Sequence, residues 1–157
     1  MQTRTKVSAA LLSLSLAGVT FIQGWEGTKQ AAYLDVVGVP TICTGSTKAV
    51  HIGQVASLGE CQERLVQDTH DAGKALARCV TAPVTQDQYD ALLSLAFNIG
   101  GGAICGSTLV RRLNSGDCLG ASNEFHKWRY AGGKPVRGLE RRRAAESAVF
   151  RKDCYGY

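Results

Sequence analysis

The sequence predicts an α+β fold, a mostly helical chain in which a small β-hairpin lobe and a helical lobe lie on either side of a cleft. Two β-rich pieces, 33–37 and 39–44, are punctuated by Gly38 and Gly45, as in a hairpin. Helical periodicity dominates after residue 57. With 157 residues, 45% hydrophobic and 20% charged, the chain has the size and composition of one folded domain. A disordered chain and a large multidomain protein are excluded.

Local capping signals predict where two of the helices begin. Ser57 and Glu60 form a capping box for a helix that runs toward Cys79. Thr85 and Gln88 form a second box, and the helix that follows has an apolar face typical of a central core helix. The members of this face are Tyr89, Leu92, Leu93, Ala96 and Phe97. After a break at 98–102, shorter helices are expected at 107–115, 117–130 and 139–151.

The chain is basic, with 18 Lys and Arg against 13 Asp and Glu and a net charge of +5. Up to residue 80 there are 7 basic and 6 acidic side chains, and beyond it 11 and 7, so most of the excess lies in the second part. This balance favours polyanionic partners. The three arginines at 141–143 cannot all face one side of a helix, so at least one is solvated or paired with Glu140 or Glu146.

Six cysteines form an even set without a CxxC pair or a Cys/His spacing typical of zinc sites, so no metal site is expected. In a reducing cytosol they would be ordinary buried thiols, whereas in an exported protein they would pair as disulfides. They are Cys43, Cys61, Cys79, Cys105, Cys118 and Cys154. No nucleotide-binding glycine loop, nucleophilic-serine motif or zinc-protease motif occurs, so neither a cofactor nor serine or zinc hydrolysis is expected.

The N-terminus has the order of charges found in membrane-targeted proteins. Arg4 and Lys6 precede an uncharged run of seventeen residues, 7–23. As a helix this run would span ~26 Å, just short of the ~30 Å hydrocarbon core of a bilayer. Ser, Ala, Thr and Gly dilute its leucines, so insertion is only weakly favourable. The alternatives are a cleaved signal peptide and an amphipathic core helix.

Two carboxylates are candidates for acid–base chemistry. Glu26 closes the first helix, and Asp35 lies nine residues later, inside the first β piece. Phe21, Ile22 and Trp25 predict apolar surroundings in which the Glu26 carboxyl is buried and keeps its proton, whereas Asp35 lies in a more polar stretch. A glycosidase needs one protonated and one ionised carboxyl of this kind.

By spacing alone, this pair also fits two solvated surface residues. Thr41, six residues beyond Asp35 on the paired strand, would place its hydroxyl beside the same water.

The motifs around these residues closely resemble the Glu/Asp/Thr catalytic motif of the phage-type lysozymes, the muramidases of glycoside hydrolase family 24. The resemblance extends from residue 24 through nearly the whole remaining chain, with several separate motifs in the correct order. The matching segments are 24–27, 35–45, 91–100, 107–114, 128–133 and 138–143.

The resemblance implies a lysozyme-like fold and an endolysin that hydrolyses the β-1,4 bond between N-acetylmuramic acid and N-acetylglucosamine in peptidoglycan. It implies that Glu26 is the general acid, that Asp35 positions the attacking water, and that Thr41 assists it. Family members of this type are inverting, so the resemblance implies inverting hydrolysis, which requires carboxyls ~6.5–9.5 Å apart. The sequence departs from the pattern at Ser46, where many members have His. No metal, cofactor or nucleic acid is implied, and the active enzyme is expected to be a monomer.

Two rival functions remain, a lytic transglycosylase and a non-catalytic cell-wall-binding module. Further substrate-binding residues are not assigned. Trp128 and Tyr130 could stack on sugars or belong to the core of the helical lobe.

The N-terminal part resembles the signal-arrest-release type of endolysin. This implies residues 1–23 as a weak transmembrane segment and 24–157 as the catalytic domain. The chain would be exported by the host secretion machinery, tethered in the inner membrane through residues 7–23, and then freed into the periplasm. We expect Cys43 to pair with Cys61, and the other four cysteines are left among three possible pairings.

Overall fold

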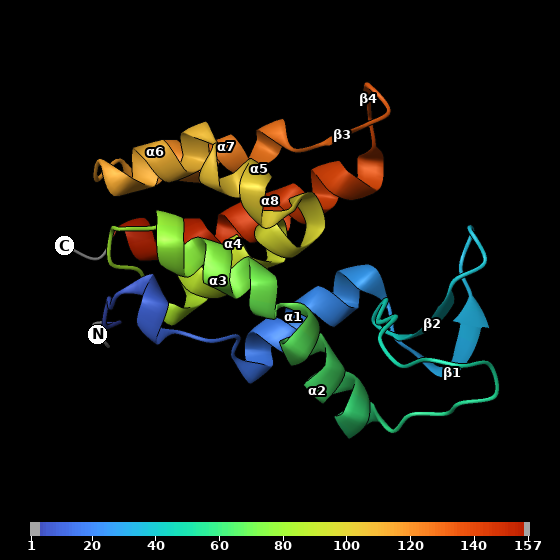
Figure 1. Cartoon of the computed structure of the whole chain (residues 1–157). Coiled ribbons are helices and arrows are strands. Elements are labelled where there is room, and N and C mark those ends of the chain that lie inside the picture. The colour runs from blue at the N-terminus through green and yellow to red at the C-terminus, as the bar shows by residue number, and fades with distance from the viewer. Residues whose placement is uncertain (1–3, 156–157) are drawn as a thin grey trace. The chain divides into compact units, whose positions relative to one another are not determined.

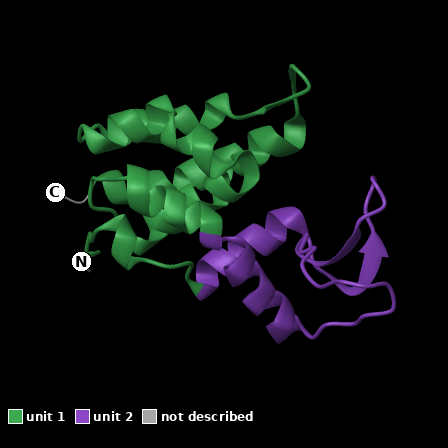
Figure 2. Ribbon diagram, in the orientation of Figure 1, with its two compact units in different colours: residues 1–15, 71–157 green, residues 16–70 purple. Residues whose placement is uncertain are grey.

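The structure, a computed structural model, describes residues 4–155, so residues 1–3 of the predicted N-terminal segment lie outside the described part. The chain forms two compact units, coloured separately in Figure 2. Unit 1 contains the chain up to Ser15 and from Asp71 onward, and unit 2 contains 16–70. The fold is mostly helical with small antiparallel sheets, which confirms the predicted α+β class. The cleft between the lobes stays a prediction.

Unit 2 is the smaller one and contains the β-hairpin. Its elements, labelled in Figure 1, are α1 (Leu16–Glu26), β1 (Lys29–Leu34), β2 (Pro40–Cys43) and α2 (Leu58–Asp68). Unit 1 contains the remaining helices and a second, very short hairpin. These elements are η1 (Ala9–Leu11), α3 (His70–Cys79, whose first residue belongs to unit 2), α4 (Gln86–Ile99), α5 (Gly101–Cys105), α6 (Thr108–Asn114), α7 (Cys118–Glu124), η2 (Phe125–Lys127), β3 (Tyr130–Ala131), β4 (Lys134–Pro135), α8 (Arg137–Arg151) and η3 (Lys152–Cys154).

Both predicted capping boxes are present. Ser57 and Glu60 cap α2, and Thr85 and Gln88 cap α4, each with both reciprocal hydrogen bonds. The helix expected from Ser57 to Cys79 is nevertheless interrupted, because α2 ends at Asp68 and α3 begins at His70. Between them, the Thr69 hydroxyl donates to the Val66 carbonyl oxygen at 2.9 Å. The hydroxyl thereby competes with backbone amides of the helix for this carbonyl.

The core of unit 1 is built around α4, as its apolar face predicts. Leu92, Leu93 and Leu95 are fully buried, so apolar contact surrounds the helix on several sides. Phe125 and Phe150 pack their rings 5.5 Å apart and belong to the same core. The hydrophobic contacts of these residues give unit 1 its main stabilisation.

The helix expected at 117–130 ends earlier, since α7 stops at Glu124 and is followed by η2. The loop expected before the last helix contains the short β3–β4 hairpin, whose turn has Gly132 and Gly133 at positive φ. The last helix, α8, begins two residues earlier than predicted.

A buried charged network joins α8 to α4. The Glu146 carboxylate is completely buried and lies 2.7 Å from the Arg143 Nε and 3.1 Å from the Arg142 Nε. The Ser94 hydroxyl donates to the same carboxylate at 2.7 Å, and Arg143 donates to the Asn98 side chain at 2.9 Å. Burial raises the pKa of Glu146, against the lowering effects of Arg143, Ser94 and Arg142. The predicted pairing within 141–143 is confirmed.

Three disulfides involve all six cysteines. Cys43–Cys61 joins β2 to α2 in unit 2, as predicted. Cys79–Cys105 joins the end of α3 to α5, and Cys118–Cys154 joins the start of α7 to η3. Each bond therefore lies within one unit.

Residues 7–23, whose length was considered above as that of one helix, do not form one continuous helix in the structure. This segment forms η1, then a stretch without regular secondary structure at 12–15, and then α1. The interruption arises from contacts with distant parts of unit 1, described below, that use the backbone of Val7 and Ser15. Across residues 4–155, none of the helices combines the length and the apolar character needed to cross a bilayer.

Candidate active site

Glu26 is the last residue of α1, and the chain leaves the helix directly after it. Gly27 has a φ of +77° and its amide donates to the Gln23 carbonyl at 2.8 Å, a left-handed helix ending that suits glycine. The Glu26 side chain is exposed, so the predicted burial is wrong. The apolar neighbours in sequence do not enclose it, because Phe21 and Trp25 pack edge-to-face on each other and Ile22 is fully buried.

Asp35 lies in the hairpin turn after β1, not inside the strand as predicted. Its Oδ1 accepts hydrogen bonds from the amides of Val37 and Val39, both at 2.9 Å. Gly38, at a φ of +82°, donates its amide to the Asp35 carbonyl at 3.0 Å and lets the chain turn back. The two hydrogen bonds to Oδ1 hold the half-buried Asp35 carboxylate in place. Pairing of Asp35 within a strand would not supply them. Among the described residues, no group donates to its Oδ2.

Thr41 lies on β2, opposite Tyr33 of β1, and only 4% of its surface is exposed. Its hydroxyl donates to the Val39 carbonyl at 2.9 Å. Val39 therefore contacts both predicted site residues, since its amide donates to Asp35 and its carbonyl accepts from Thr41. The structure brings Asp35 and Thr41 together around one backbone residue.

Strand β1 connects Glu26 to this pair. Glu26 precedes the strand by three residues, and Asp35 follows its last residue. β1 pairs antiparallel with β2 on one edge, with an irregularity between Lys29 and Tyr33. On its other side, the Ala32 amide donates to the Gln54 carbonyl at 2.9 Å. Strand β1 is hydrogen-bonded on both sides, so the positions of its two ends are fixed within unit 2.

A small hydrophobic cluster and one disulfide support the hairpin. Ile42, Cys43, Ala56 and Cys61 form this buried cluster below β2. Ser46, which replaces the expected His, is buried and exchanges two backbone hydrogen bonds of 2.9 Å with Ile42. The departure at this position therefore places a bridge residue next to β2, and not a titratable group.

Sequence reasoning missed the part played by Val39. An Asp followed three residues later by Gly is typical of a turn closed by the aspartate side chain, and this signal could have placed Asp35 correctly. The contact of Thr41 with Val39 has no comparable sequence signal. Within the described part of the chain, no cluster of three His, Cys, Asp or Glu could hold a metal ion.

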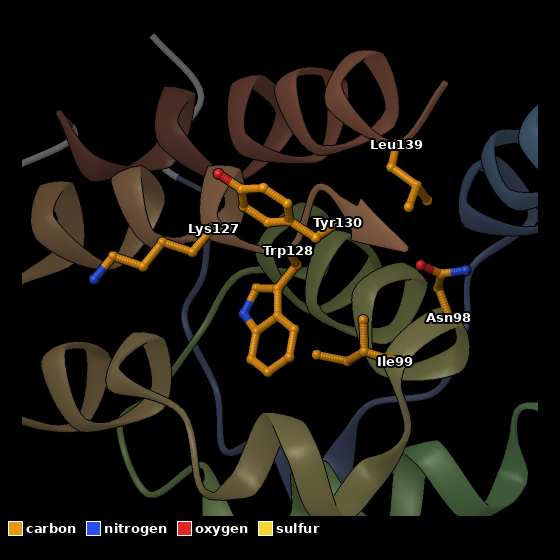
Figure 3. A pocket seen from close by; sticks show the side chains of 6 residues that line it. All are labelled: Asn98, Ile99, Lys127, Trp128, Tyr130 and Leu139. Atoms are coloured by element: carbon orange, nitrogen blue, oxygen red, sulfur yellow. The ribbon is translucent and has the colours of Figure 1, made fainter. Parts of the chain in front are cut away.

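Unit 1 carries an open pocket of about 530 Å³, shown in Figure 3. It is lined by Asn98, Ile99, Lys127, Trp128, Tyr130 and Leu139. Trp128 packs partly against the main core and also faces the pocket, while Tyr130 is 52% exposed and carries the Arg129 guanidinium 5.0 Å from its ring. The core interpretation of Trp128 thus holds in part, and its stacking on sugars stays a prediction.

The two units differ in charge. Unit 1 carries 15 Lys and Arg against 8 Asp and Glu, a charge of +7, and unit 2 carries 3 against 5, a charge of −2. The excess of positive charge lies in the unit with the pocket, as the sequence predicted for the second part of the chain. Arg142 and Arg143 are buried, so of the three consecutive arginines only Arg141 is exposed.

A helical unit and a hairpin unit that carries Glu, Asp and Thr at these places together define a lysozyme-like protein. The chain belongs to the phage lysozyme family, whose model matches residues 23–146. It is 34% identical to the SAR-endolysin of Enterobacteria phage P21 over 89% of this chain and 86% of that protein.

Solved structures agree with this family. A P22 lysozyme mutant has a TM-score of 0.85 at 36% identity, covering 89% of this chain and 99% of the other. The muramidase domain of SpmX from Asticaccaulis excentricus has a TM-score of 0.79 at 32% identity, covering 88% of this chain and 97% of the domain. The chain is thus a phage endolysin of the lysozyme class, a glycoside hydrolase.

Proposed function

We propose that this chain hydrolyses the β-1,4 bond between N-acetylmuramic acid and N-acetylglucosamine in bacterial peptidoglycan, with Glu26, Asp35 and Thr41 as catalytic residues. The observation that carries this proposal is the arrangement around Val39, whose backbone is hydrogen-bonded both to a carboxylate and to a hydroxyl. The muramidase domain and the phage lysozymes that resemble this chain support the same reaction class.

In the proposed reaction, Glu26 gives its proton to the glycosidic oxygen as the bond to the anomeric carbon breaks. A water molecule attacks that carbon from the opposite face, and its proton passes to Asp35. The Thr41 hydroxyl proton is already donated to Val39, so the Thr41 oxygen is left as an acceptor that orients the water. Attack from the opposite face inverts the configuration. Because Glu26 is exposed in the protein alone, the bound glycan supplies the dry surroundings that a proton donor needs.

Analysis of the fragments tests hydrolysis against the transglycosylase alternative. When peptidoglycan is digested in water enriched in ¹⁸O, each cut is expected to leave a reducing muramic acid end that carries one labelled oxygen, because water is the nucleophile. Mass spectrometry of the fragments checks this. Unlabelled 1,6-anhydro ends would contradict the proposal, and NMR of the first product would test inversion.

We further infer that residues 7–23 serve as a weak inner-membrane tether for an exported chain that is later freed into the periplasm. Leu11 and Leu16 are 79% and 68% exposed, although both are large and apolar. Such exposure has no packing benefit in the folded protein but would favour insertion into a bilayer. The three disulfides suit an oxidising compartment, and the SAR-endolysin relative carries this mode of export in its name. While the tether spans the bilayer, Glu26 would be held at the membrane surface.

Replacing Leu11 and Leu16 together by Ser is expected to lower the ratio of membrane-bound to soluble protein by about fivefold. Two leucines contribute roughly 1 kcal/mol to insertion, and neither is needed for packing. Cell fractionation measures the ratio, with Leu119→Ser, at a partly exposed leucine of α7, as the control. An unchanged ratio would contradict the tether. N-terminal sequencing of the soluble protein should begin at residue 1, since a cleaved signal peptide would begin later.

A further inference from the structure

Residues 7–15, the first part of the proposed tether, form extensive contacts with unit 1. Val7 and Val84 exchange two backbone hydrogen bonds of 2.9 Å each. Ala9 is only 1% exposed and belongs to the main hydrophobic core, and Leu12 and Leu14 pack against that core. The same residues therefore complete unit 1 in the soluble protein.

Asp90 on α4 is the polar centre of these contacts. It is 5% exposed, and its carboxylate accepts hydrogen bonds from the Ser15 amide at 3.1 Å and from the Ser15 hydroxyl. A third bond comes from the Gln86 side chain at 2.9 Å, which also donates to the Ser13 carbonyl at 2.9 Å. Two of the three hydrogen bonds to this buried carboxylate thus come from the tether.

The surroundings of Asp90 make the hydrogen bonds from Ser15 and Gln86 important for its carboxylate. Burial raises the pKa of Asp90, the bonds from Ser15 and Gln86 lower it, and the neighbouring Asp87 raises it. Asp87 itself forms ion pairs with Arg4 and, at 2.8 Å, with Lys152. The positive charges of these two side chains are therefore paired with Asp87. Ser15 thus supplies two of the three hydrogen bonds to the buried Asp90 carboxylate, and a buried carboxylate without such donors is unfavourable.

We propose that Asp90 is a docking site that captures residues 7–15 as they leave the bilayer, and that the strength of this docking sets the share of released protein. This inference rests on the proposed tether. Residues 7–15 cannot lie in the membrane and on Asp90 at once. Only the released state has these contacts. Their free energy therefore shifts the equilibrium between membrane-bound and released protein toward the released state, as a ligand that binds one of two states does.

Hydrogen–deuterium exchange on the soluble full chain tests the docking itself. Ser15→Ala and Asp90→Ala are each expected to speed amide exchange at residues 7–15 by about tenfold, the effect of losing a hydrogen bond to a charged group. Ser13→Ala is the matched control in the tether, because the Ser13 side chain is exposed, and Asp71→Ala is an exposed-acid control in unit 1. Exchange in α8 should stay unchanged in every variant, which shows that the fold is intact.

The double variant tests whether the two residues act through one contact. Ser15→Ala combined with Asp90→Ala is expected to exchange like Asp90→Ala alone. Additive effects, or exchange at 7–15 that matches the wild type in either single variant, would overturn the docking site.

Membrane fractionation then tests capture. Asp90→Ala leaves the tether sequence intact, yet it is expected to raise the ratio of membrane-bound to soluble protein by about tenfold, whereas Ser13→Ala and Asp71→Ala should leave it unchanged. An unchanged ratio in Asp90→Ala would overturn capture. A wild-type chain with no membrane pool would refute the tether and capture together, and the exchange experiment on soluble protein would still decide whether Asp90 holds residues 7–15.

Discussion

Replacing Glu26 by Gln is expected to lower the rate of peptidoglycan digestion by at least ~100-fold, because the amide cannot supply the proton that the leaving oxygen needs. The substitution preserves shape at an exposed position, so the melting temperature should change little. The clearing of a suspension of purified cell walls measures the rate.

The surroundings of Asp35 make this test selective for the acid. The Asp35 carboxylate is held by backbone amides of its own turn, so loss of the Glu26 carboxyl leaves the water-positioning pair intact. Glu63→Gln, at an exposed glutamate on α2 of the same unit, is the matched control and should digest walls at the wild-type rate. Clearing by Glu26→Gln at a rate near that of Glu63→Gln would disprove the assignment of Glu26.

Replacing Glu146 by Ala is expected to lower the free energy of unfolding by about 3–5 kcal/mol, the usual cost of removing one partner from a buried ion pair. The variant would leave the Arg143 and Arg142 guanidinium groups in the interior without the carboxylate that they share. It would also remove the acceptor of the Ser94 hydroxyl, so the connection between α8 and α4 would weaken.

Urea unfolding with the disulfides intact measures this effect. Glu140→Ala, at an exposed position near the start of the same helix, is expected to change the unfolding free energy by less than about 0.5 kcal/mol. A loss below about 1 kcal/mol in Glu146→Ala would show that the two arginines find other partners, and the stabilising role assigned to Glu146 would be wrong.

Features that depend on local sequence were predicted well. The capping boxes at Ser57 and Thr85 act within four residues, and both were placed correctly. The apolar face of α4 predicted the central helix, because burial of one helix follows from its own periodicity. The Cys43–Cys61 disulfide was expected, and it holds the hairpin to α2.

Features that depend on distant contacts were missed. The predicted burial of Glu26 assumed that apolar neighbours in sequence are neighbours in space, whereas Phe21 and Trp25 pack on each other. The N-terminal run was expected as one helix because nothing within it indicates that Val84 and Asp90 would contact it. The positions of Asp35 and Thr41 around Val39 depend on a turn whose closure involves side chains as well as backbone.

The order of the disulfides has a consequence for biogenesis. The six cysteines are bonded in three consecutive pairs along the chain, first with second, third with fourth and fifth with sixth, with separations of 18, 26 and 36 residues. For a polypeptide that is threaded through a secretion pore from its N-terminus, every pair can close as soon as its second thiol emerges, before the following pair has arrived. For a chain exported as we propose, sequential oxidation would give the native connectivity directly, and a thiol oxidant would suffice without an isomerase that reshuffles mispaired bonds.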